Sequence, residues 1–208
     1  MSDLFQDGVP DSYVMQVVRV MQMANWHTYQ VLTKRADRMR ELLETQLAFA
    51  ANDEHIWWGV SVEDKKYGLP RLNSLRQTKA AMKFLSVEPL LEDLGKVAFK
   101  GIDWVIVGGE SGHGARPMDE VWVQSIMKQC RTDNVPFFFK QWGGVRKSET
   151  GRTLNGRTFD EMPQLKQTAI PARRERISMI EEVSRWHSRG NVIPLMLNTG
   201  VHDIEQPY

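Results

Sequence analysis

Short apolar runs alternate along the chain with segments in which apolar residues recur every three or four positions. The runs, at residues 27–33, 56–62, 82–87, 102–108 and 135–139, are typical of strands that are buried on both faces. The periodic segments predict amphipathic helices, for example over residues 14–21, 39–47 and 119–130. This alternation of strand and helix favours parallel βα units.

Each of the five predicted strands ends at a charged residue. These residues are Lys34, Glu63, Glu88, Glu110 and Lys140. In a parallel barrel the carboxyl ends of all strands lie on one face, where the loops build the active site. We therefore predict an α/β fold, a partial (βα) barrel of parallel strands. An open doubly wound sheet is the alternative, because several crossovers are short and the helix before residue 82 is weak.

The pattern changes after residue 152. Asn155 and Gly156 stand between β-compatible residues and predict a hairpin. Residues 171–188 read as a charged helix, and residues 192–197 as a short strand that Pro194 restricts to a sheet edge. We expect a barrel domain over residues 1–163 and a C-terminal extension, a helix with a short strand, over residues 164–208.

Composition limits the classes of function. A hydrophobic content of 41% and a net charge of +1 are ordinary for a soluble globular protein. Nucleic acid stays open as a partner, but the net charge does not indicate it. We find no run long enough to span a membrane and no signal peptide, and expect a cytoplasmic protein without membrane partners. The single cysteine, Cys130, excludes a cysteine-cluster metal site made by this chain alone.

The charged strand ends are the candidate site. Carboxylates there can bind hydroxylated or amino ligands, hold a divalent ion, or act as acid and base; the alternative is that each charge only marks where a strand meets water. No metal-ligand spacing is present, and no residue is assigned a catalytic role. The predicted ligand pocket, for an unknown small-molecule or nucleotide-related ligand, comprises Lys34, Glu63, Glu88, Gly108, Gly109, Glu110, His113, Arg116, Lys140 and Trp142.

The glycines after residue 107 have two interpretations. Gly108, Gly109, Gly112 and Gly114 could present backbone N–H groups to a phosphate or carboxylate, although their spacing matches neither the P-loop nor the dinucleotide fingerprint. Glycines at such a place also let a neighbouring backbone approach closely.

Seven blocks of sequence, in order, resemble a family found in phages and bacterial genomes and catalogued as a domain of unknown function. They are MSDLF at residues 1–5, QVLTKR at 30–35, WGVSVE at 58–63, LSVEPL at 85–90, VGGESG at 107–112, FKQWGG at 139–144 and GRTFDEMP at 156–163. The resemblance covers roughly residues 1–163.

Complete members of that family look like radical S-adenosylmethionine (SAM) proteins with a βα-barrel core and three cysteines near the N-terminus. The resemblance therefore implies SAM as a cofactor. Three thiolates are needed for the iron–sulfur cluster, which is not expected in a chain whose one cysteine is Cys130. The chain then looks like a shortened member, and three functions stay open: an enzyme of this class, a binding or accessory protein that docks on a partner, and an inactive remnant.

Overall fold

The computed structural model describes residues 3–165 and 168–188. The chain divides into two units, residues 1–170 and residues 171–208. The first unit contains the sheet and all the predicted site residues, and the second contains the last helix.

The first unit is built on one five-stranded sheet. Its strands are β1 (Tyr29–Thr33), β2 (Ile56–Ser61), β3 (Met82–Val87), β4 (Trp104–Gly108) and β5 (Phe137–Gln141). They lie side by side in sequence order, and every neighbouring pair is parallel. All five predicted strands are therefore confirmed.

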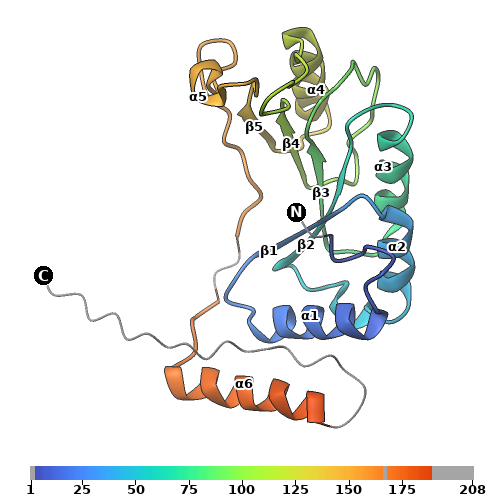
Figure 1. Cartoon of the computed structure of the whole chain (residues 1–208), viewed down its shortest axis with the longest axis vertical. Coiled ribbons are helices and arrows are strands. Elements are labelled where there is room, and N and C mark those ends of the chain that lie inside the picture. Colours follow the sequence, from blue (N-terminus) through green and yellow to red (C-terminus); the bar gives the residue numbers. More distant parts are fainter. Residues whose placement is uncertain (1–2, 166–167, 189–208) are drawn as a thin grey trace, which may run out of the picture. The chain divides into compact units, whose positions relative to one another are not determined.

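The unit also contains helices: α1 (Asp11–Met23), α2 (Ala36–Glu44), the 3₁₀ turn η1 (Ala48–Ala50), α3 (Gly68–Gln77), α4 (Glu120–Thr132) and the short α5 (Lys147–Thr150). Of these, α2 with η1 connects β1 to β2, α3 connects β2 to β3 and α4 connects β4 to β5, whereas β3 leads to β4 without a helix. Figure 1 shows α2, α3 and α4 on the same side of the sheet. When each new strand is added on the same side of the previous one, right-handed crossovers place the connecting helices on one face of the sheet.

The prediction of a partial barrel is confirmed, but the sheet is open and does not close. A doubly wound sheet reverses its strand order at a switch point, whereas the order here runs from β1 to β5 without reversal. The arrangement therefore corresponds to consecutive units of a βα barrel opened out.

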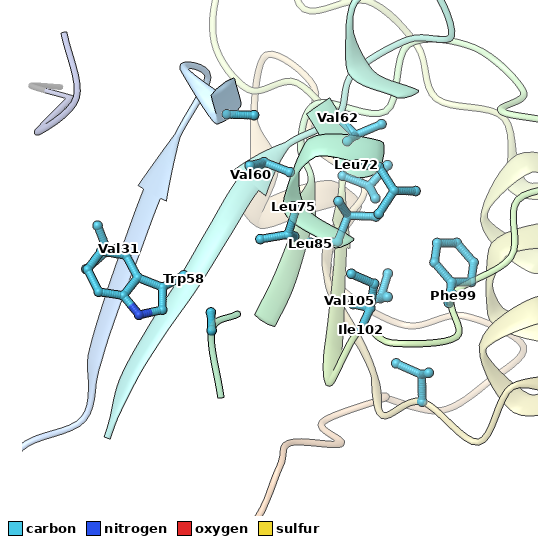
Figure 2. Close-up of a cluster of buried hydrophobic side chains, with 14 of the residues drawn as sticks. Val31, Trp58, Val60, Val62, Leu72, Leu75, Leu85, Phe99, Ile102 and Val105 are labelled. Atoms are coloured by element: carbon cyan, nitrogen blue, oxygen red, sulfur yellow. The ribbon is translucent and has the colours of Figure 1, made fainter. Parts of the chain in front are cut away.

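The main core lies between the sheet and its helices, on what we call the helix face. Val31, Trp58, Val60, Leu85 and Val105 point to this side from four strands. Figure 2 shows Leu72 and Leu75 of α3 packed over them, with Phe99 and Ile102 from the segment before β4 filling the space beside Val105. Burial on this face fixes the register of the sheet, because a slip of one residue would turn these side chains to the opposite side.

The opposite side, the inner face, is layered from one end of the strands to the other. A cluster of large side chains occupies its amino-terminal half: Trp57, Phe84, Trp104 and Ile106, with Leu32, Met82 and Phe138 against them. Gly59 belongs here because the ring of Phe84 occupies the place where a side chain would stand. Ser61 and Ser86 lie in register with Ile106 and Phe138 of this cluster, and the charged residues follow.

After α5 the chain returns to β5. The predicted hairpin is present as a tight turn, in which Leu154 and Arg157 exchange both backbone hydrogen bonds around Asn155 and Gly156. Asp160 then bridges Phe138 antiparallel, and the Phe139 N–H donates to the Phe159 carbonyl at 2.9 Å.

The second unit contains α6 (Arg173–Ser188), which confirms the helix predicted over residues 171–188. The strand predicted over residues 192–197 lies outside the described residues.

Candidate functional site

The five charged residues at the carboxyl ends of the strands form what we call the polar edge: Lys34, Glu63, Glu88 and Glu110, which follow their strands, and Lys140, which lies inside the longer observed β5. Each is an even number of residues beyond an inner-face residue of its own strand, such as Leu32, Trp57 or Phe84. Side chains alternate between the two faces of a strand. Lys34, Glu63, Glu88 and Lys140 therefore belong to the same face as the cluster of large side chains.

Glu63 is the most enclosed of these residues, with only 6% of its surface exposed. Its carboxylate is paired with the ammonium of Lys34 and with the guanidinium of Arg71, whose Nη1 lies 2.6 Å from Oε2. Burial raises the pKa of Glu63, but the hydrogen bonds and charges of Lys34 and Arg71 lower it more, so the net pKa is below its usual value. Two cations therefore share this one carboxylate where β1 and β2 end.

Glu88 is the centre of a second group of polar contacts on the polar edge. The Ser86 hydroxyl donates to Oε2 of Glu88 at 3.1 Å, and the Lys140 ammonium donates to the same oxygen at 3.2 Å. A side chain at Gly108 would begin 2.5 Å from Oε1 of Glu88. The absence of a side chain at Gly108 is thus what allows the Glu88 carboxylate to lie over the end of β4.

Glu110 is paired within its own loop. Arg116 donates hydrogen bonds to the Glu110 carboxylate from Nε and Nη2, both at 2.8 Å, and from the Arg116 backbone N–H at 2.9 Å. The side-chain hydrogen bond from Arg116 is the largest cause that lowers the pKa of Glu110, to about 2.

We expect Arg116→Gln to return the pKa of Glu110 toward its ordinary value of 4.5. The reason is that the substitution removes the charge and the two-pronged contact that favour the ionised form. An NMR titration of the Glu110 side-chain carboxyl in both proteins measures this. An unchanged midpoint would show that the loop is open in solution.

Gly109 and Gly143 allow the backbones of the loops after β4 and β5 to approach each other closely. A side chain at Gly109 would overlap the Trp142 carbonyl, and one at Gly143 would overlap the Glu110 carbonyl. Hydrogen bonds from Gly109 N to Gln141 O at 2.9 Å and from Gly144 N to Glu110 O at 2.6 Å join the loops. Of the two interpretations of this glycine stretch, the structure supports the approach of a neighbouring backbone at Gly109.

The last two predicted pocket residues lie apart from the paired charges. His113 is exposed in the loop that follows Glu110. Trp142 packs edge-on against Phe139, with 4.8 Å between ring centroids, and its Nε1 donates to the Thr153 carbonyl at 2.8 Å. Trp142 therefore anchors the returning chain, and a role for either residue in ligand binding stays a prediction.

Two hollows lie away from the polar edge. One, of about 620 Å³, lies between residues 95–98 and α4, and a small one of about 20 Å³ is lined by Trp57, Met82 and Leu165 among others. In the part of the chain that the structure describes, no group of three or more His, Cys, Asp or Glu side chains could hold a metal ion. The described carboxylates of the polar edge are instead paired with cations of the chain itself.

Sequence reasoning missed Arg71, Ser86 and Asp3. Ser86 carried a usable signal, because it is a polar residue inside an apolar strand two positions before Glu88 and so on the same face. Asp3 accepts hydrogen bonds from the Thr33 hydroxyl and the Lys34 N–H and pairs with Arg35. It thereby fixes the backbone from which Lys34 projects.

The sequence fits the family described as a protein of unknown function, DUF5131, over residues 1–163. No match was found among curated proteins or solved structures. No helix within the described residues is both long enough and apolar enough to cross a membrane. The matched range runs from the first residue past the last strand of the sheet, and the chain belongs to the DUF5131 family.

Proposed function

We propose that the polar edge binds a small ligand through an anionic group, and that this group contacts Lys34 and Arg71 at the ends of β1 and β2. The observation that carries the proposal is the buried Glu63, which holds two cations at once. Within this group of three side chains one positive charge is left over, and the group lies at the carboxyl end of a parallel sheet, where α/β folds bind their ligands.

The two cations differ in accessibility, which suits them to different tasks. The Lys34 side chain is 52% exposed and can reach a ligand, whereas that of Arg71 is 20% exposed and also donates to the Ser61 carbonyl. Because Glu63 holds both cations in place before a ligand binds, less side-chain conformational entropy is lost on binding. The ion pair of Glu88 with Lys140 has no net charge and offers polar contacts to the remainder of the ligand.

Phosphate-bearing, nucleotide-related molecules are the ligand class that we propose. The phosphate oxygens would accept hydrogen bonds from Lys34 and Arg71, since charge-assisted contacts to phosphate are strong and Arg can present two N–H groups. Counted from β1, which Lys34 follows, Ser86 and Lys140 lie two and four strands further along the same edge, at a spacing of about 4.8 Å per strand. That span fits a molecule larger than phosphate alone.

The resemblance to radical-SAM proteins makes SAM a second ligand to test. The thiol present does not fit an iron–sulfur cluster: Cys130 is the single cysteine, it is buried on α4, and burial raises its pKa to about 12. Cluster ligation requires accessible thiolates, three from the protein. We therefore propose ligand binding without cluster chemistry by this chain's own cysteine.

Isothermal titration with phosphate, pyrophosphate, a nucleoside triphosphate and SAM tests the proposal. Lys34→Gln is expected to weaken the binding of a phosphate ligand about tenfold or more, because a hydrogen bond to a charged group is worth about 1.5–3 kcal/mol. Lys100→Gln is the matched control, since Lys100 is an exposed lysine before the amino end of β4. No heat with any phosphate compound, or equal binding by the two variants, would contradict the proposal.

A docking role is the second candidate, and the free edge of β1 favours it. In the described residues β1 pairs only with β2. Tyr29 donates toward β2, so by alternation Gln30 and Leu32 turn their N–H and C=O groups outward. An added strand from a partner would satisfy them. Hydrogen exchange of the Gln30 and Leu32 amides distinguishes a covered edge, with slow exchange, from a free one.

A further inference from the structure

Helix α6 exposes apolar side chains along one line. Ile177 is 45% exposed and Ile180 is 55% exposed, and their spacing of three residues places them on the same side of the helix. Exposed isoleucines aligned in this way on a helix rich in charged residues are typical of a surface that pairs with another helix.

The charges of α6 are partly separated along its length. Arg173, Arg174 and Arg176 outnumber Glu175 at its start, and Glu181 and Glu182 outnumber Arg185 in its second half. An isolated helix is stabilised by the reverse order, because its N-terminal end carries positive partial charge. None of these side chains has an ion-pair partner within the described range of residues. The separation is therefore better explained by a partner than by the helix itself.

We infer that α6 pairs with α6 of a second copy of this chain, in antiparallel orientation. With Ile177 and Ile180 at the two core positions of a heptad, Ile177 packs against the partner's Ile180, and the symmetry repeats this layer. The same register sets Arg174 beside the partner's Glu181. The basic start of each helix then lies along the acidic half of the other.

The parallel orientation is disfavoured by the same charges. It would bring Arg173 of both copies together at a core position and align the basic starts of both helices. In the parallel orientation the partner's Glu181 would lie beside Arg176, whereas in the antiparallel orientation it lies beside Arg174. The two orientations thus predict different ion pairs for the same glutamate, which makes them separable by experiment.

Charge reversal tests the inference in the full chain. Sedimentation equilibrium over a range of concentrations is expected to show a reversible dimer. Arg174→Glu and Glu181→Arg should each weaken it about tenfold, because symmetry doubles every lost pair. The double variant Arg174→Glu/Glu181→Arg should recover wild-type association. Far-UV circular dichroism checks that α6 stays helical in each variant.

The matched control is Arg176→Glu/Glu181→Arg, which has the same net charge as the rescuing pair. The antiparallel dimer predicts no recovery in this control, and recovery here instead of with Arg174 would overturn the orientation. Ile177→Ser/Ile180→Ser should abolish the dimer. A monomeric wild-type chain at all concentrations, or a dimer that survives this serine variant, would overturn the inference as a whole.

Discussion

Replacing Gly109 by alanine is expected to destabilise the protein by about 4 kcal/mol or more, at the extreme of single substitutions. The added carbon would overlap the carbonyl oxygen and the carbonyl carbon of Trp142. Both belong to backbone that is tied by the hydrogen bonds of Gly109 and Gly144, so neither can move aside without breaking the joined loops. Urea unfolding followed by circular dichroism measures the loss.

Two other glycines separate this steric effect from backbone strain. Gly8→Ala meets no atom within 4 Å and should change stability by less than about 0.5 kcal/mol. Gly101 also has open space but a φ of +82°, so its alanine variant should cost about 1–2 kcal/mol through conformation alone. If Gly109→Ala were no worse than Gly101→Ala, the close approach of the two loops would be wrong.

Glu63→Gln is expected to cost about 3 kcal/mol, the lower end of the range for breaking a buried ion pair. Glutamine keeps the shape but leaves the mostly buried Arg71 without its counter-charge. The cost stays at the lower end because the half-exposed Lys34 can turn to water. Glu149→Gln makes the same chemical change in a pair whose side chains are 76% and 65% exposed, and it should cost less than about 0.5 kcal/mol.

The effect of Glu63→Gln should also depend on pH. Because the pKa of Glu63 is lower in the folded protein than its ordinary value of 4.5, its carboxylate contributes stability above pH 4.5. That contribution is lost as the pH falls through the folded value. The difference in Tm between wild type and Glu63→Gln should therefore be full at pH 7 and shrink on acidification below pH 4.5. A constant difference across this range would rule out the charged pair as its cause.

The strands were predictable because each is buried on at least one face and carries a short run rich in apolar and β-forming residues. Residues 56–62 are an example, and all of β2 (Ile56–Ser61) is buried. The parallel arrangement followed from the intervening helices. Whether the sheet closes did not follow, because closure depends on the number and tilt of strands, which no local pattern records.

The polar edge was predictable in location but not in pairing. A charge at the end of each strand is visible in the sequence, whereas its partner comes from elsewhere. Arg71 reaches Glu63 because α3 begins directly against the end of β2, where the missing side chain of Gly68 lets the two backbones approach near Val62. Only the fold reveals such contacts. For the same reason Gly109 could not be assigned to a ligand or to the Trp142 carbonyl from sequence alone.

The return of the chain to β5 limits how copies of this sheet could combine. The outward N–H of Phe139 is taken by Phe159, that of Phe137 by the Glu161 carboxylate, and Asp160 bridges Phe138. One edge of the sheet is thereby sealed by the chain itself, while β1 pairs on one side only within the described residues. Endless edge-to-edge stacking needs two open edges per copy. Association through strands must therefore stop at a closed pair, so the sheet is protected against fibre growth without a charge or a proline on β1.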